Sequence, residues 1–125
     1  MERVLIVALG GALGSAARYV LAGAVQRATT VQFPTGTWAV NIIGSLLVGF
    51  VAGVALDRQA GIGPGLRLFL LMGFCGGFTT FSALSYETME LLRAGELLRA
   101  GVNALGQIGL GLAAVWTGLI LARAL

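Results

Sequence analysis

Four long apolar stretches, separated by short polar connections, set the pattern of this chain of 125 residues. The bilayer core requires about 20 mostly apolar residues per helix, whereas β-barrel strands are shorter and alternate in polarity. The stretches are Val4–Val25, Thr37–Leu56, Leu68–Tyr86 and Ala100–Ala122, and the only charged residue within them is Arg18. The pattern therefore predicts an all-α integral membrane protein, with residues 1–125 forming a single domain of four transmembrane helices.

The composition is that of a membrane protein, and it argues against several classes of function. Charged residues make up only 10% of the chain, against about a quarter in a soluble domain. The chain has no histidine and one cysteine, Cys75, so histidine acid–base catalysis is excluded and no Cys/His metal site is expected. The eight basic residues are dispersed arginines, unlike the clustered charge that binds nucleic acid. No nucleophile–base pair lies in the spans, so an enzyme has little support.

The arginines that flank the spans are divided almost evenly between the two sides of the membrane. One side would hold Arg3, Arg58, Arg67 and Arg123, and the other side would hold Arg27, Arg93 and Arg99. Positive charge normally marks the cytoplasmic side, and four against three gives almost no bias. The count is consistent with a noisy small sample and equally with dual topology, in which copies insert in both orientations.

Glycine pairs four residues apart occur in three of the spans. They are Gly10/Gly14, Gly49/Gly53 and Gly73/Gly77. Small residues at this spacing let helix backbones approach closely in lipid, where no hydrophobic force drives helices together. The pairs predict close helix packing, either within one subunit or between subunits.

The third span carries a cluster that disfavours a continuous helix. Residues Gly73–Ser82 read Gly-Phe-Cys-Gly-Gly-Phe-Thr-Thr-Phe-Ser, with paired glycines followed by three hydroxyl side chains. Glycine weakens a helix, and threonine and serine compete for its hydrogen bonds. We expect a break at 76–80, with free carbonyls before it and capped N–H groups after it. Such breaks mark ion and substrate sites in membrane proteins, although a simple kink is the alternative.

Other polar residues inside the spans are candidates for function. Arg18 could reach the interface or form a cationic vestibule for anions. The amide of Asn41 could serve an interhelical hydrogen bond or a ligand. Asn103 and Gln107 lie four residues apart on one helix face, where they could form a polar lining, a hydrogen-bond network, or both. Glu87 ends the third span as an interfacial acid.

Three motifs together resemble the Fluc (CrcB) fluoride channel family. They are Gly-Gly-Ala-Leu-Gly-Ser-Ala-Ala-Arg-Tyr at Gly10–Tyr19, Gly-Thr-x-x-x-Asn at Gly36–Asn41, and the cluster at Gly73–Ser82. The resemblance covers all four spans in order. It implies a multi-pass protein of the inner (plasma) membrane that forms an antiparallel dual-topology homodimer surrounded by lipid. It also implies two fluoride pores and passive export of fluoride, which relieves its toxicity.

The resemblance also implies individual residue roles. Backbone carbonyls of Gly76 and Thr79, two from each subunit, would bind a structural Na⁺ at the dimer interface. Glu87 matches the acid after the break. The residues that would line the fluoride pore are Arg18, Asn41, Thr80, Phe81, Ser82, Leu84, Asn103 and Gln107.

Three of these positions depart from the family pattern. Leu84 stands where the family has a second pore phenylalanine, Asn103 where members often have tyrosine, and Gln107 where they often have serine. Residues three apart share a helix face, so Phe81 and Leu84 should line one pore, and Phe78 is a further candidate for that face.

Two other classes remain open at the level of sequence. A proton-coupled antiporter of the small multidrug-resistance type also has four spans and dual topology. Such an antiporter needs a carboxylate within its first span, where this chain has Arg18 and no acid beyond Glu2. An accessory membrane subunit without transport of its own would have polar groups satisfied entirely by packing.

Overall fold

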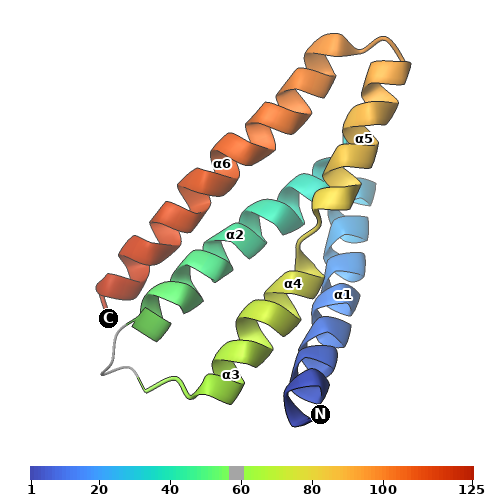
Figure 1. Ribbon diagram of the computed structural model, residues 1–125. Helices are drawn as coiled ribbons and strands as arrows, with labels where there is room; N and C mark the ends of the chain where they lie inside the picture. Colours follow the sequence, from blue (N-terminus) through green and yellow to red (C-terminus); the bar gives the residue numbers. More distant parts are fainter. Residues whose placement is uncertain (57–60) are drawn as a thin grey trace.

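The computed structural model describes residues 1–56 and 61–125, and every regular element in those ranges is helical. The elements are α1 (Glu2–Ala28), α2 (Thr35–Leu56), α3 (Pro64–Leu68), the π-helical segment η1 (Phe69–Cys75), α4 (Gly76–Phe78), α5 (Phe81–Arg93) and α6 (Leu97–Arg123) (Figure 1). Both termini lie at the same end of the molecule, as an even number of spans requires.

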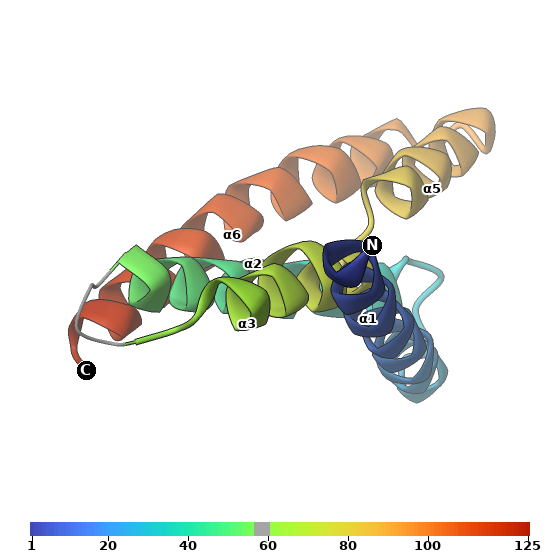
Figure 2. The ribbon, with the colours of Figure 1, turned by 60° about the horizontal axis from the view of Figure 1, so that its bottom comes forward.

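Four helical segments are long and apolar enough to cross a bilayer. They are α1, α2, the interrupted segment Pro64–Arg93, and α6. We call Pro64–Arg93 the third span. This arrangement confirms the predicted all-helical membrane fold with a broken third span, and the four apolar stretches of the sequence fall inside these segments. Figure 2 shows α1 and α6 on opposite sides of a layer formed by α2 and the first half of the third span.

Glycines allow two close helix pairings within the chain. A Cβ atom on Gly10 would lie 2.6 Å from the carbonyl oxygen of Phe69, and one on Gly14 would overlap the carbonyl of Phe74. On α2, a Cβ atom on Gly49 would overlap the carbonyl of Val115 on α6. Backbone therefore packs directly on backbone, as close-packed helices in lipid require. The structure assigns these glycines to packing within one subunit.

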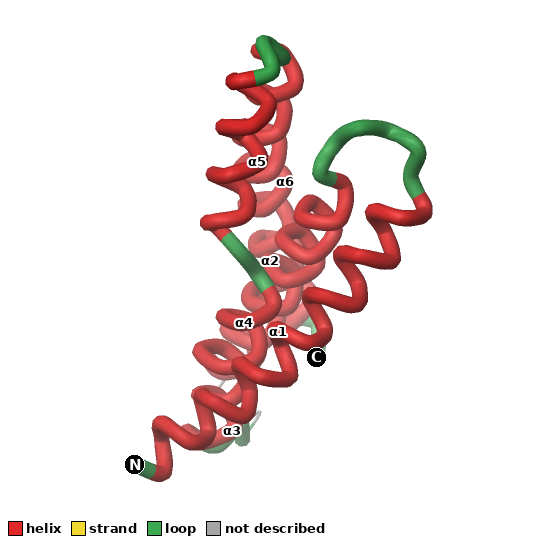
Figure 3. The backbone as a smooth tube through the Cα atoms, turned by 90° about the vertical axis from the view of Figure 1, so that its right-hand side faces the viewer, coloured by secondary structure: helices red, strands yellow, loops and turns green. Residues whose placement is uncertain are grey.

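The break in the third span consists of two residues with extended backbone. Thr79 has φ −92° and ψ 160°, and Thr80 has φ −151° and ψ 114°. The Thr80 hydroxyl accepts a hydrogen bond from the N–H of Ala83 at 3.1 Å and so caps α5. Figure 3 shows the break as the loop between α4 and α5. It falls inside the predicted range, at its C-terminal end.

Candidate functional site

A cavity of about 360 Å³ lies beside the break, between α2, α5 and α6. Five of the predicted pore residues line it, namely Asn41, Thr80, Phe81, Leu84 and Gln107. Phe81 begins α5 and is 76% exposed, whereas Leu84, one turn later, is 8% exposed. The structure thus brings Phe81 and Leu84 to one cavity, with amide and hydroxyl groups around them.

Asn41 stabilises the break by hydrogen bonding to both the N–H and the carbonyl of Thr80. Its Oδ1 accepts a hydrogen bond from the N–H of Thr80 at 2.8 Å, and its Nδ2 donates to the carbonyl of Thr80 at 3.1 Å. The same Nδ2 donates to Oε1 of Gln107 at 2.8 Å. An amide nitrogen carries two hydrogens, so both donors of Asn41 are used within the chain. Asn41 therefore fixes the backbone conformation of the break as well as lining the cavity.

A chain of buried amides continues from Asn41 across α6. Gln107 Nε2 donates to Oδ1 of Asn103 at 2.9 Å, and Asn103 Nδ2 donates to the hydroxyl of Thr88 at 3.0 Å. Asn103 is fully buried and Gln107 is 4% exposed. Trp38 donates its indole N–H to the same Asn103 oxygen at 2.7 Å. The two amides thus form an interhelical network, and Gln107 also faces the cavity, while Asn103 lies behind it.

A second cavity, of about 550 Å³, lies on the other side of Thr80, between α1, α2 and α5. Arg18, Thr37 and Ser82 line it, together with Thr80 itself. The Thr80 and Ser82 hydroxyls are 3.2 Å apart. Thr80 belongs to both cavities, so the break separates a cavity with one cationic side chain from a cavity of uncharged donors. Ser82 and Arg18 are thereby placed apart from the other predicted pore residues.

Glu87 joins α5 to α2 beyond this second cavity. Its Oε1 accepts a hydrogen bond of 2.6 Å from the hydroxyl of Thr37. Its Oε2 is buried and has no hydrogen-bond partner among the described residues. A buried carboxylate oxygen without a hydrogen-bond partner carries a desolvation cost.

The break diverts the usual helical donors of several carbonyls, and those of Gly76 and Thr79 are among them. In an uninterrupted helix, the N–H of Thr80 would meet the carbonyl of Gly76, but it donates to Asn41 instead. Likewise, the N–H of Ala83 would meet the carbonyl of Thr79, but it donates to the hydroxyl of Thr80. Gly76 is exposed and Thr79 half-buried. These residues fit a hard cation, which prefers oxygen ligands.

Phe78 does not share the face of Phe81, which corrects one expectation from the sequence. Phe78 is 4% exposed and stacks on Phe74, with ring centroids 5.7 Å apart. Residues three apart share a face only in a continuous helix. The extended residues Thr79 and Thr80 lie between the two phenylalanines, so the side chains of Phe78 and Phe81 point in different directions.

Two residues of α2 that hydrogen-bond to the site were not predicted from the sequence. Trp38 and Thr37 bind residues 65 and 50 positions away in the sequence, and no local pattern marks such pairs. Ser45 also lines the first cavity, one turn after Asn41, and the four-residue spacing could have indicated it.

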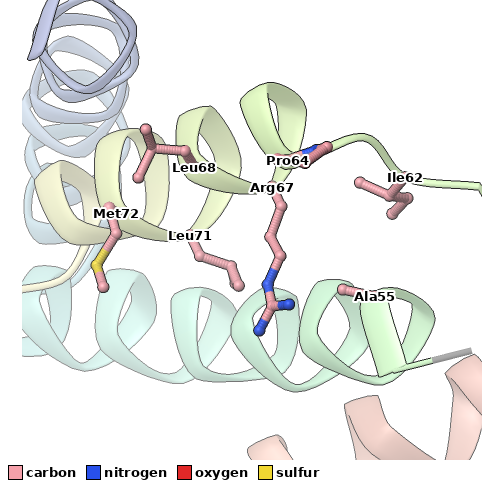
Figure 4. A pocket seen from close by; sticks show the side chains of 7 residues that line it. All are labelled: Ala55, Ile62, Pro64, Arg67, Leu68, Leu71 and Met72. Carbon is pink, nitrogen blue, oxygen red and sulfur yellow. The ribbon is translucent and has the colours of Figure 1, made fainter. Parts of the chain in front are cut away.

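A further cavity, of about 310 Å³, lies at the end of the molecule that holds α3. Its lining is apolar except for Arg67, whose side chain extends toward α2 near Ala55 (Figure 4). A cation near the C-terminal end of α2 suits the negative end of the helix dipole. This cavity lies away from the break and contains none of the predicted site residues.

The fold and site define a class: a multi-pass membrane protein whose broken helix borders a cavity of uncharged donors. Residues 5–119 match the family described as CrcB-like protein, Camphor Resistance (CrcB), and the chain belongs to this family. It is 49% identical over 119 residues, 95% of both chains, to the "Fluoride-specific ion channel FluC" of Nitratidesulfovibrio vulgaris. It is 46% identical to that of Geobacter sulfurreducens over the whole of both chains, and 47% identical to that of Chlorobaculum tepidum over 98% of this chain and 96% of the relative.

Proposed function

We propose that this protein is a fluoride-selective ion channel that lets F⁻ leave the cell passively and so relieves fluoride toxicity. The observation that carries the proposal is the first cavity, where uncharged donors and an aromatic residue meet at a broken helix. Membership of the family and the names of its close relatives support the same function. The reaction is movement of an ion down its gradient, so we propose no enzymatic activity.

The chemistry of the cavity suits a small, strongly hydrated anion. A pore for such an ion must replace its water with hydrogen-bond donors. Gln107 Nε2 gives one hydrogen to Asn103 and keeps a second, and the hydroxyl of Thr80 lies on the same wall. The edge of the Phe81 ring carries weak positive charge and can also face an anion. Arg18 in the adjoining cavity would attract anions to the entrance.

The antiporter alternative lacks its essential group in this chain. A proton-coupled exchanger of cationic substrates needs a carboxylate within its first span. The only acid of α1 is Glu2, in its first turn, and the charged group nearer the break is Arg18. Glu87 lies on α5, not in the first span, and accepts a hydrogen bond from Thr37.

Fluoride efflux from liposomes tests the function directly. Purified protein is reconstituted into vesicles loaded with potassium fluoride, and valinomycin is added to balance the charge. We expect rapid release of fluoride and little release of chloride from matched chloride-loaded vesicles. Release of both ions at similar rates, or of neither, would contradict a fluoride-selective channel. A requirement for a proton gradient would favour the antiporter.

We also propose that two copies pair in antiparallel orientation. The third span leaves Met72 and Phe81 exposed at 69% and 76%, and Gly76 lies exposed between them in the sequence. The near-even division of arginines suits insertion in both orientations. A cysteine engineered at the N-terminus should be labelled from both sides of the membrane in cells. Cys75 is buried and should contribute little background. Labelling from one side alone would contradict the pairing.

Within such a dimer, Gly76 and Thr79 of each subunit would supply four carbonyl oxygens to a structural Na⁺. The ion would neutralise the partial negative charge of two half-helix ends that face each other. A bound ion stabilises the state that binds it, so the dimer should unfold at a higher temperature in sodium chloride than in N-methyl-D-glucamine chloride of equal ionic strength. Equal unfolding temperatures over a wide range of sodium concentration would contradict the site.

A further inference from the structure

Trp38 lies in a narrow slot that directs its indole N–H toward Asn103, the last of the three hydrogen-bonded side-chain amides Asn41, Gln107 and Asn103. A Cβ atom added to Gly106 would lie 2.5 Å from Cη2 and 2.9 Å from Cζ2 of Trp38, so the indole lies directly on the α6 backbone. Phe33 packs against the same ring at a centroid distance of 5.7 Å and an angle of 53°. The nitrogen then lies 2.7 Å from Oδ1 of Asn103. Glycine on one side and phenylalanine on the other thus fix the direction of the indole.

The indole determines which way the buried amides point. An indole nitrogen can only donate, so Asn103 must turn its oxygen toward Trp38. That oxygen also accepts from Gln107, which must therefore present its nitrogen to Asn103 and its oxygen to Asn41. At the far end, the backbone N–H of Thr80 can likewise only donate, and it meets Oδ1 of Asn41. Donor-only groups at both ends thus impose the same direction on all three amides.

We propose that Trp38 is a positioning residue for anion conduction, and this proposal rests on the proposed fluoride channel function. By occupying the oxygen of Asn103, Trp38 keeps the nitrogen of Gln107 on Asn103 and its oxygen on Nδ2 of Asn41, so that Asn41 keeps both of its hydrogen bonds to the backbone of Thr80 beside the cavity. If Asn103 turned over, its NH₂ group would face the N–H groups of Trp38 and Gln107, and the chain would have to reverse. A reversed Gln107 would present its NH₂ group to the NH₂ group of Asn41, and Asn41 could turn over only by losing its hydrogen bond from the N–H of Thr80, which would loosen the break beside the cavity.

A double-mutant cycle tests whether Trp38 acts through Asn103. Trp38→Phe keeps an aromatic ring in the slot and removes the N–H together with part of the apolar surface of the indole. Since one hydrogen bond contributes about 1 kcal/mol, we expect roughly a fivefold loss of fluoride efflux per dimer. In an Asn103→Leu background, the same substitution should cause no further loss. Equal losses in both backgrounds would mean that Trp38 acts by packing alone and would overturn the proposal. Trp116→Phe is the matched control, because Trp116 is 63% exposed, and it should conduct normally.

A spectroscopic measurement keeps the proposal testable without flux. In a Trp116→Phe protein, Trp38 is the only one of the two tryptophans left, so the indole N–H vibration in resonance Raman spectra reports Trp38 alone. We expect the hydrogen-bonded frequency in this protein and a shift toward the free N–H frequency on adding Asn103→Leu. An unshifted band would overturn the pairing of Trp38 with Asn103. If wild-type liposomes release no fluoride, the proposed function fails, and the Raman result still decides on the pairing.

Discussion

The two faces of the third span differ in what they contact, although they belong to one short stretch of chain. On one face, Gly73 and Gly77 press against the backbone of α1. On the other face, Gly76 and Phe81 lie open. The first face packs within the subunit. The second, which we call the open face, carries the carbonyl of Gly76, whose usual helical donor binds Asn41, and the exposed ring of Phe81. The difference teaches that neighbouring glycines of one motif can have separate roles: Gly77 packs within the subunit, whereas the exposed Gly76 belongs to the proposed contact between subunits.

The glycine pair allows the sharpest test of this comparison and the largest expected effect. A Cβ atom on Gly77 would lie 2.5 Å from the carbonyl oxygen of Gly11, so Gly77→Ala forces two helices apart. We expect at least about 1–3 kcal/mol of destabilisation and little folded protein in detergent extracts. On Gly76, the nearest atom to a Cβ would be the carbonyl oxygen of Leu71 at 3.9 Å, so one subunit accommodates Gly76→Ala.

Gly76→Ala should therefore yield folded subunits that fail to pair or conduct. Size-exclusion chromatography with light scattering measures pairing, and liposome efflux measures conduction. Fully active Gly76→Ala dimers would break the comparison, because the open face would then tolerate a side chain. Well-folded Gly77→Ala protein would also contradict it, because the packed face would then tolerate a side chain.

Asn41→Asp should abolish fluoride efflux by disturbing the break and the cavity beside it. Aspartate cannot donate, so the carbonyl of Thr80 and Oε1 of Gln107 would face a carboxylate instead of an amide. Each unsatisfied buried group costs about 1–3 kcal/mol, and a negative charge beside the cavity repels an anion. Efflux is measured per dimer, with Ser45→Ala as the control, because Ser45 lines the same cavity one turn away. Efflux from Asn41→Asp at the control rate would contradict the role of Asn41.

Thr79→Ser should have the smallest effect. The ligand proposed at this position is the main-chain carbonyl, and serine keeps the hydroxyl that donates to the carbonyl of Cys75 at 3.0 Å. We expect near-normal efflux and an unchanged dependence of the unfolding temperature on sodium. A large loss of sodium dependence would indicate that the threonine methyl group or its hydroxyl, and not the backbone, determines the ion site. A Cβ atom on Gly44 would overlap Cγ2 of Thr79, so a small loss of stability from this methyl group is the expected cost.

The sequence predicted those features that depend on local composition. Four apolar stretches of bilayer length specify four spans, and the glycines and hydroxyls at 73–82 specify where the third span breaks. Asn41 and Gln107 were candidates because polar residues inside a membrane span are rare, and Phe81 was a candidate through its place in the family motif; all three line the first cavity.

Relations between helices could not be predicted in the same way. The bonds from Trp38 to Asn103 and from Thr37 to Glu87 depend on how far each helix is rotated and shifted against its neighbour. The π-helical turns of η1 change the direction of every residue after Phe69, and the extended residues change it again. Phe78 was therefore expected beside Phe81 and is instead buried against Phe74.

The measurement that tests the account most directly is fluoride efflux per intact dimer for Phe81→Ile and Phe78→Leu. Phe81 lies on the open face and lines the cavity, whereas Phe78 lies on the packed face. We predict that Phe81→Ile stops fluoride efflux, because isoleucine offers no positive ring edge to an anion. Phe78→Leu should lower stability by about 1 kcal/mol and leave efflux per surviving dimer unchanged. Normal efflux from Phe81→Ile, with loss of efflux from Phe78→Leu, would contradict the assignment of function to the open face.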